Sequence, residues 1–263
     1  MIDTHCHLAF PQLAGRVEEV LADAAGAGVH GMITVSTTSA DCRESLALAE
    51  RFENVWCTAG IHPLYADQAC DWETVRTVAR HPRCVAWGEL GLDNHYQEPL
   101  AATQRRILEE HLALIESCSG DAMDKPLIIH CRDAFDDLLP VLGDASFEAN
   151  RCVFHCFNST SEDARKVLDF GAWISFTGIV TFRNARQVAE AAKLVPPDRI
   201  MVETDSPFLT PEPMRKIFPN EPQYLVHIAR FLADLRGADQ DEFAEVLDAN
   251  ARSFFGISAP QRC

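Results

Sequence analysis

The feature that most constrains the fold is a regular alternation of short apolar runs and amphipathic stretches along the chain. Apolar runs bounded by glycine, proline or polar residues are typical of buried strands, whereas apolar residues three and four apart indicate helices. The predicted strands span residues 2–7, 31–36, 55–61, 84–89, 127–130, 152–155, 172–176 and 200–205. The predicted helices span residues 13–27, 40–51, 71–80, 101–118, 133–142, 161–170, 184–194, 221–235 and 239–250.

Strict alternation of strand and helix implies parallel strands. Eight such units in a chain of 263 residues predict a (β/α)8 barrel, with a doubly wound open sheet as the alternative. No linker or second-domain signal interrupts the pattern, so residues 1–263 are predicted to form one domain. The proline-rich segment 207–222 follows the last strand, where a barrel would place a long loop at the mouth of its site.

Composition narrows the function classes. Hydrophobic residues make up 47% of the chain, but no apolar run approaches the roughly 20 residues that a membrane span needs. Because the chain also opens directly on a strand, without a signal-like segment, a cytoplasmic protein is expected. The formal charge of −16 argues against a broad electrostatic contact with nucleic acid, yet it allows a nucleic acid held by one end. The oligomeric state cannot be predicted.

Side chains that bind metals stand at the ends of five predicted strands. Two histidines of the first strand lie two residues apart, so both imidazoles face the same way. In a (β/α)8 barrel the carboxyl ends of the strands form the active site, and these side chains are therefore expected to converge. Any one of them alone could be structural, but agreement among five separate segments favours a metal site. The six candidate ligands are His5, His7, Glu89, His130, His155 and Asp205.

Six ligands exceed the four that one tetrahedral ion needs, so two divalent ions are expected. Glu89 lies midway around the barrel and has two oxygens, which makes it the predicted bridge between the ions. Paired ions clamp the attacking and leaving oxygens of a displacement at phosphorus or at a carbonyl. Asp205 is the predicted general base, because a carboxylate beside a metal-activated water can take its proton.

The ten cysteines are scattered and form no C-x-x-C motif, so free buried thiols are expected. Cys6, Cys131 and Cys156 each neighbour a candidate ligand histidine. Alternation along a strand would turn these three thiols away from the metals.

Several strings resemble the signature blocks of the TatD family of metal-dependent hydrolases. They are MIDTHCHL, AGIHP, GELGLD, PLIIHCRDA, VFHCFNST, WISFTGIVTFRNA and VETDSPFLTP, and the resemblance runs over residues 1–256. It implies a barrel with a two-metal site and a magnesium- or manganese-dependent deoxyribonuclease, often an exonuclease, with zinc also found. Carried over, His5, His7 and Asp205 would hold one ion, His130 and His155 the other, and Glu89 would bridge them.

The resemblance also implies residues around the substrate. The AGIHP block places His62 there, and the HCRDA block places Arg132 where its guanidinium could grip a phosphate. A structural histidine at position 62 and a salt bridge for Arg132 remain the alternatives. Glu203 would share a face with Asp205 and support the ligands from behind.

The chain departs from the family pattern in its loops. Ala9 replaces a common aspartate, Asn94-His95-Tyr96 replaces a pair of tyrosines, and residues 214–222 differ from the usual Arg-Gly-containing loop. None of these departures touches a proposed ligand, but they fall in loops that would line the mouth of the site and so leave the substrate open. DNA is the expected substrate on the resemblance, with an ester or amide such as an aminoacyl-tRNA linkage as the alternative. A non-catalytic metal-binding scaffold is the third hypothesis.

Overall fold

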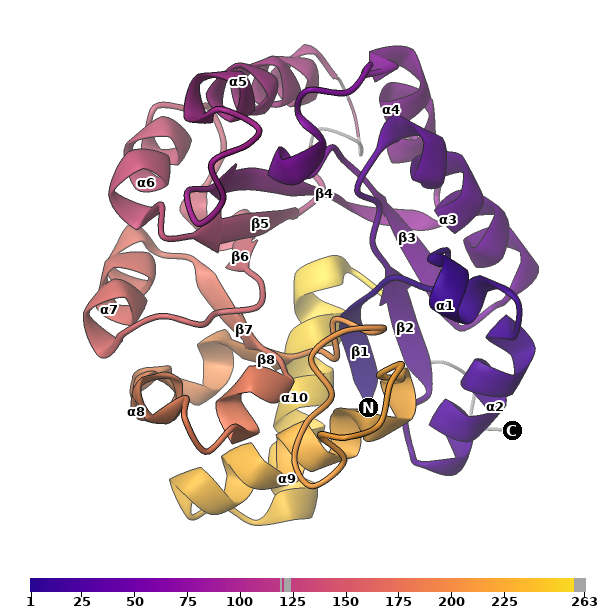
Figure 1. The fold of residues 1–263 in the computed structure, drawn as a ribbon, viewed down its shortest axis with the longest axis vertical. Helices are drawn as coiled ribbons and strands as arrows, with labels where there is room; N and C mark the ends of the chain where they lie inside the picture. Colours follow the sequence, from indigo (N-terminus) through magenta and orange to yellow (C-terminus); the bar gives the residue numbers. More distant parts are fainter. Residues whose placement is uncertain (119, 121–123, 258–263) are drawn as a thin grey trace.

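The computed structural model describes residues 1–118, 120 and 124–257. The strands of this part are parallel and pair in chain order from the first to the eighth (Figure 1). They are β1 Ile2–Cys6, β2 Gly31–Thr34, β3 Val55–Ala59, β4 Cys84–Asp93, β5 Leu127–Arg132, β6 Cys152–Phe154, β7 Trp173–Phe176 and β8 Ile200–Val202. The predicted (β/α)8 barrel is confirmed, because a doubly wound sheet would reverse its strand order.

Helices surround the strands in Figure 1 and cover the outside of the barrel. They are α1 Pro11–Ala14, α2 Val17–Gly26, α3 Ser39–Arg51, α4 Trp72–Ala79, α5 Ala101–Ser117, α6 Phe135–Gly143, α7 Ser161–Phe170, α8 Arg186–Leu194, α9 Leu225–Arg236 and α10 Gln240–Phe255. Short 3-10 turns add η1 Pro63–Tyr65, η3 Ala149–Arg151, η4 Gly178–Thr181, η5 Pro197–Arg199 and η6 Pro222–Tyr224. None of the described helices is both long and apolar enough to cross a bilayer.

The barrel closes between β1 and β8 through individual hydrogen bonds. The amide of Asp205 donates to the carbonyl of His5 at 2.9 Å. The buried carboxylate of Asp3 accepts bonds from the amide and the hydroxyl of Thr204, at 2.9 and 2.5 Å. These bonds fix the segment after β8 against β1, so candidate ligands from the two ends of the chain meet.

The interior of the barrel near the N-terminal ends of its strands is filled by apolar side chains. Side chains from seven strands pack there with residues of α10 and the segment after it, and all are nearly or fully buried. They include Ile2, Ile33, Val35, Trp56, Val85, Ile128, Val153, Met201, Ala251, Phe255 and Ile257. This apolar plug, as we call it below, closes the barrel on the side opposite the candidate ligands.

Several element boundaries differ from the predictions, among them those of the first helix, the fourth strand and the eighth strand. The helix predicted over 13–27 is two helices, α1 and α2, because the backbone leaves the helical conformation at Arg16, with φ −144°. β4 continues four residues past Glu89 to Asp93, since Gly91 and Asp93 pair with β5. β8 ends at Val202, so Asp205 lies in the loop that follows the strand rather than within it.

Candidate metal centre

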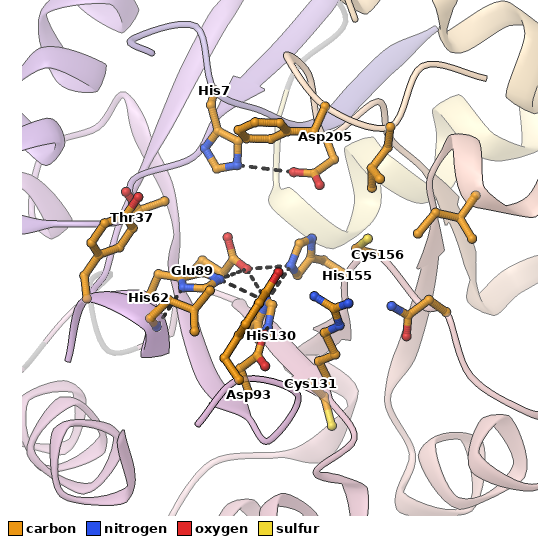
Figure 2. A pocket seen from close by; sticks show the side chains of 18 of the residues that line it. His7, Thr37, His62, Glu89, Asp93, His130, Cys131, His155, Cys156 and Asp205 are labelled. Atoms are coloured by element: carbon orange, nitrogen blue, oxygen red, sulfur yellow. Dashed lines mark hydrogen bonds and ion pairs between the residues drawn. The ribbon is translucent and has the colours of Figure 1, made fainter. Parts of the chain in front are cut away.

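All six predicted ligands meet at the C-terminal ends of the strands, and Figure 2 labels each of them except His5. Five of them line a pocket of about 480 Å³, and His5 lies buried beneath it. Figure 2 shows His7 and Asp205 on one side of this pocket and Glu89 with His130 and His155 on the other. The convergence that was expected from the strand ends is therefore present.

The first group of ligand atoms comes from His5 in β1, from His7 just after β1 and from the loop after β8. The Nε2 atoms of His5 and His7 are 3.3 Å apart, and the Oδ1 atom of Asp205 lies 3.2 Å from the Nε2 atom of His7. The Nδ1–H of His7 donates to the carbonyl of Val35 at 3.0 Å. This bond leaves the Nε2 lone pair of His7 facing Asp205, which is the tautomer that can bind a cation.

Glu89 lies between the first group and the second. Its Oε2 atom is 3.3 Å from the Nε2 atom of His5. Its Oε1 atom is 2.7 Å from Nδ1 of His130, 2.6 Å from Nε2 of His155 and 3.2 Å from Nε2 of His62. Because each oxygen faces a different group, the carboxylate has the placement that a bridging ligand requires.

Glycines around Glu89 allow this placement. A Cβ atom at Gly91, where φ is +152°, would lie 1.9 Å from the carbonyl oxygen of His130. A Cβ atom at Gly60 would lie 2.4 Å from the backbone of Gly88. Side chains at these positions would force the strands apart and would move Glu89 away from the histidines.

Buried carboxylates hold the outer nitrogens of two candidate ligands. The Nε2–H of His130 donates to Oδ2 of Asp93 at 3.0 Å, and Nδ1 of His155 lies 3.3 Å from Oε1 of Glu203. Glu203 also accepts bonds from the amide of Cys156 at 2.6 Å and from a serine hydroxyl of β7. Glu203 was expected behind the ligands. It does not line the pocket, and it contacts His155 from the side away from Glu89.

Asp93 was not identified from the sequence. The predicted strand ended at Glu89, but the alternation of residues 89, 91 and 93 on one face of a longer strand would have pointed to it. The side chain of Gln104 in α5 fixes Asp93 by accepting from its amide and donating to its carbonyl, both at 2.8 Å. Asp93 is therefore a rigid acceptor for His130.

Charge at the site favours cation binding. Burial alone would raise the pKa of Glu89, but its contacts with the imidazoles of His155, His62 and His130 hold that pKa well below its usual range. Burial also opposes ionisation of Asp205, yet the adjacent imidazoles of His7 and His5 keep its pKa below the usual range. Deprotonated carboxylates beside imidazole nitrogens form a donor set that fits divalent metals.

His62 lies closer to the ligand atoms than the sequence indicated. Its Nε2 atom is 3.1 Å from Nδ1 of His130, and burial lowers its pKa. The amide of Leu64 donates to its Nδ1 atom at 3.0 Å. The neutral ring therefore carries its hydrogen on Nε2 and presents a donor to the pocket, next to Glu89.

Arg132 lines the pocket at the end of β5, and among the described residues no carboxylate lies within ion-pair distance of it. Its Cζ atom lies 5.3 Å from the ring centroid of Tyr96. The salt bridge that was its alternative role is absent from the described structure. The guanidinium is therefore available to an anion in the pocket.

Of the three cysteines beside candidate ligands, Cys6 and Cys131 follow the prediction; Cys263 lies outside the described residues. Cys131 lines the pocket, but Figure 2 shows its sulfur directed away from Glu89. Cys156 also lines the pocket, with its sulfur 3.7 Å from the hydroxyl of Thr177. β6 ends at Phe154 and φ of Cys156 is +47°, so strand alternation no longer governs its direction. No cysteine belongs to a group of candidate ligand atoms among the described residues.

The contact between Asp93 and His130 leads to a prediction. In an Asp93→Asn variant, we expect metal affinity at one of two positions to fall about 10- to 100-fold, because the amide is a weaker acceptor for the histidine N–H. Titration of the metal-depleted protein with manganese would measure both affinities. Asp136→Asn, which removes an exposed carboxylate of α6, is the matched control. Unchanged affinity at both positions in Asp93→Asn would contradict the prediction.

Comparison with known proteins gives a consistent result. The family model described as "TatD related DNase" matches residues 2–256. The metal-dependent hydrolase YcfH of Escherichia coli K12 is 38% identical over 262 residues, covering 98% of this chain and 97% of that protein. The 3'-5' ssDNA/RNA exonuclease TatD of Enterobacter lignolyticus is 33% identical, covering 98% and 100%. The crystal structure of YJJV, a TatD homolog from Escherichia coli, superposes with a TM-score of 0.90 at 29% identity, covering 98% of each chain.

Proposed function

The chain belongs to the family of TatD-related DNases and is a metal-dependent hydrolase, and from this premise we propose that it is an exonuclease that cleaves phosphodiester bonds at the end of a nucleic acid strand. Two relatives named as 3'-5' ssDNA/RNA exonucleases, at 33% and 32% identity, support the substrate class. The observation that carries the proposal is the position of Glu89, whose two oxygens face two separate groups of ligand atoms.

In this proposal His5, His7 and Asp205 hold one divalent ion, His130 and His155 hold a second, and Glu89 is shared. Magnesium or manganese is the proposed metal on the family resemblance, while the imidazole-rich donor set also suits zinc. Such paired ions would polarise the phosphoryl group and activate a water for attack. Each residue in these roles stands within 3.7 Å of another member of its group.

The protein's own side chains would complete the chemistry. Asp205, held anionic beside His7, is placed to accept the proton of the attacking water. Arg132 would donate to a phosphate oxygen, since its guanidinium lines the pocket. The Nε2–H of His62 lies beside Oε1 of Glu89 in the pocket. It would donate a hydrogen bond to a substrate oxygen or to water. Glu203 and Asp93 would orient the two histidines of the second group.

The test is hydrolysis of a short single-stranded DNA labelled at one end, with magnesium, manganese, zinc or chelator present. We expect a ladder that recedes from one terminus, together with loss of all cleavage in chelator. Labelling the opposite end in a second reaction gives the polarity. Intact DNA in the presence of protein that holds two metals, with turnover of an aminoacyl ester, would instead place the activity at a carbonyl.

A further inference from the structure

Aromatic side chains stand around the mouth of the pocket, above the candidate ligands. This aromatic rim comprises Phe10, Tyr65, Tyr96 and Phe208, all of which line the pocket. The rings of Tyr96 and Phe208 are 51% and 41% exposed, which is unusual for large apolar side chains in this protein. Stable folding does not require rings in such exposed positions, so their exposure needs another explanation.

The rim has two walls. Phe10 follows β1 and Phe208 follows β8, and their ring centroids are 6.1 Å apart. Tyr96 follows β4, and Arg132 at the end of β5 lies over its ring. Because the strands are ordered one to eight around the barrel, β1 and β8 lie across from β4 and β5 (Figure 1). Apolar surface therefore faces the metal centre from opposite sides of the mouth.

Positive charge along the pocket wall is low. Arg132 is the one lysine or arginine among the described residues that line the pocket. The formal charge of −16 also argues against holding a long polyanion by many phosphate contacts. A nucleic acid bound here needs a source of affinity other than charge, and stacking of unpaired bases on aromatic rings is one that any base sequence can use.

We propose that the aromatic rim is a base-stacking site that holds the unpaired nucleobases on the two sides of the scissile phosphate, with Tyr96 and Phe208 as its main rings. This inference rests on the proposed nuclease function and specifies its substrate as a single-stranded end. In a duplex end, each base is already stacked and paired, so its faces are not free for the rim. Tyr96 and Phe208 thus determine specificity, whereas the ligand groups act on any phosphodiester.

The test combines a change in the protein with a change in the substrate. The kcat/KM of wild type and of Tyr96→Ala is measured on two single-stranded oligonucleotides. One has all its bases, and the other lacks the base on one side of the terminal linkage. In wild type, loss of the stacked base should lower kcat/KM about 5- to 150-fold. In Tyr96→Ala the intact substrate should show a similar loss, and base removal on that side should add nothing further. Phe208→Ala should give the same pattern for the base on the other side.

Two matched variants serve as controls. Tyr96→Phe keeps the ring and should retain the discrimination between intact and abasic ends. Phe218→Ala removes a ring that is 65% exposed in the same loop as Phe208 but does not line the pocket, and it should behave as wild type. Affinity for an oligonucleotide with a non-hydrolysable terminal linkage provides a second readout that does not depend on turnover.

The outcomes separate the two proposals. Phosphodiester cleavage by wild type with equal kcat/KM for intact and abasic ends would overturn the stacking site and leave the nuclease function in place. Additive losses from the ring and base deletions would overturn it as well. Absence of any phosphodiester cleavage by metal-loaded wild type would overturn the nuclease function itself.

Discussion

An Asp205→Asn variant should fold as wild type does and hydrolyse DNA about 10²- to 10⁴-fold more slowly, the range expected when a general base is removed. Asparagine has the same shape but carries no charge and cannot accept a proton from water. The backbone at this position has φ +53°, a left-handed conformation that asparagine tolerates as readily as aspartate does. The hydrogen bond from the backbone N–H of residue 205 to the carbonyl of His5 is also kept in the variant. Closure of the barrel therefore does not depend on the carboxylate.

Three measurements on Asp205→Asn are needed: kcat, metal content and thermal unfolding. Loss of activity with two metals still bound would identify Asp205 mainly as the base, whereas loss of one metal would identify it mainly as a ligand. Asp133→Asn is the matched control, because Asp133 also has positive φ, at +54°, and is exposed outside the pocket. A wild-type turnover rate in Asp205→Asn would show that Asp205 is neither the general base nor a required metal ligand.

Glu89→Gln is the second change with a large expected effect. The glutamine oxygen can face one group of ligand atoms, but its NH₂ group cannot bind a cation on the other side. We therefore expect the protein to retain fewer metal ions than wild type after dialysis and to lose hydrolysis along with them. Glutamine also removes the buried negative charge that three histidines face within 3.2 Å.

Metal content by elemental analysis, at matched protein concentration, gives the direct readout for Glu89→Gln. Glu190→Gln, which changes an exposed glutamate of α8, controls for the lost charge. A metal count equal to that of wild type would show that Glu89 does not bridge, even if activity fell.

The barrel and the convergence of the six candidate ligands could be predicted because both depend on local pattern. Each short apolar run identifies a strand, and the barrel rule then places residues such as His130 at one face. The contact of Asp93 with His130 was not predicted, because the length of β4 depends on its pairing with β5. The residues of β4 alone do not reveal that pairing. The contact of His62 with Glu89 spans neighbouring strands, and strand order gives neighbours without giving distances.

Loop geometry was the least predictable part. Cys156 turns into the pocket because its backbone has positive φ beyond the end of β6, which no period-two pattern anticipates. Tyr96 and Phe208 lie in irregular segments, and their sequence neighbours do not indicate that they approach the same pocket. One of the loop departures from the family pattern contains Tyr96, which lines the pocket.

The apolar plug beneath the site has a consequence for how a polymer would be degraded. Because packed side chains such as Trp56 and Met201 seal the barrel below the ligands, a strand cannot thread through the molecule. If the chain is the proposed exonuclease, the substrate end and the released nucleotide would use the same opening. We would then expect it to release the strand between cleavages rather than to travel continuously along it.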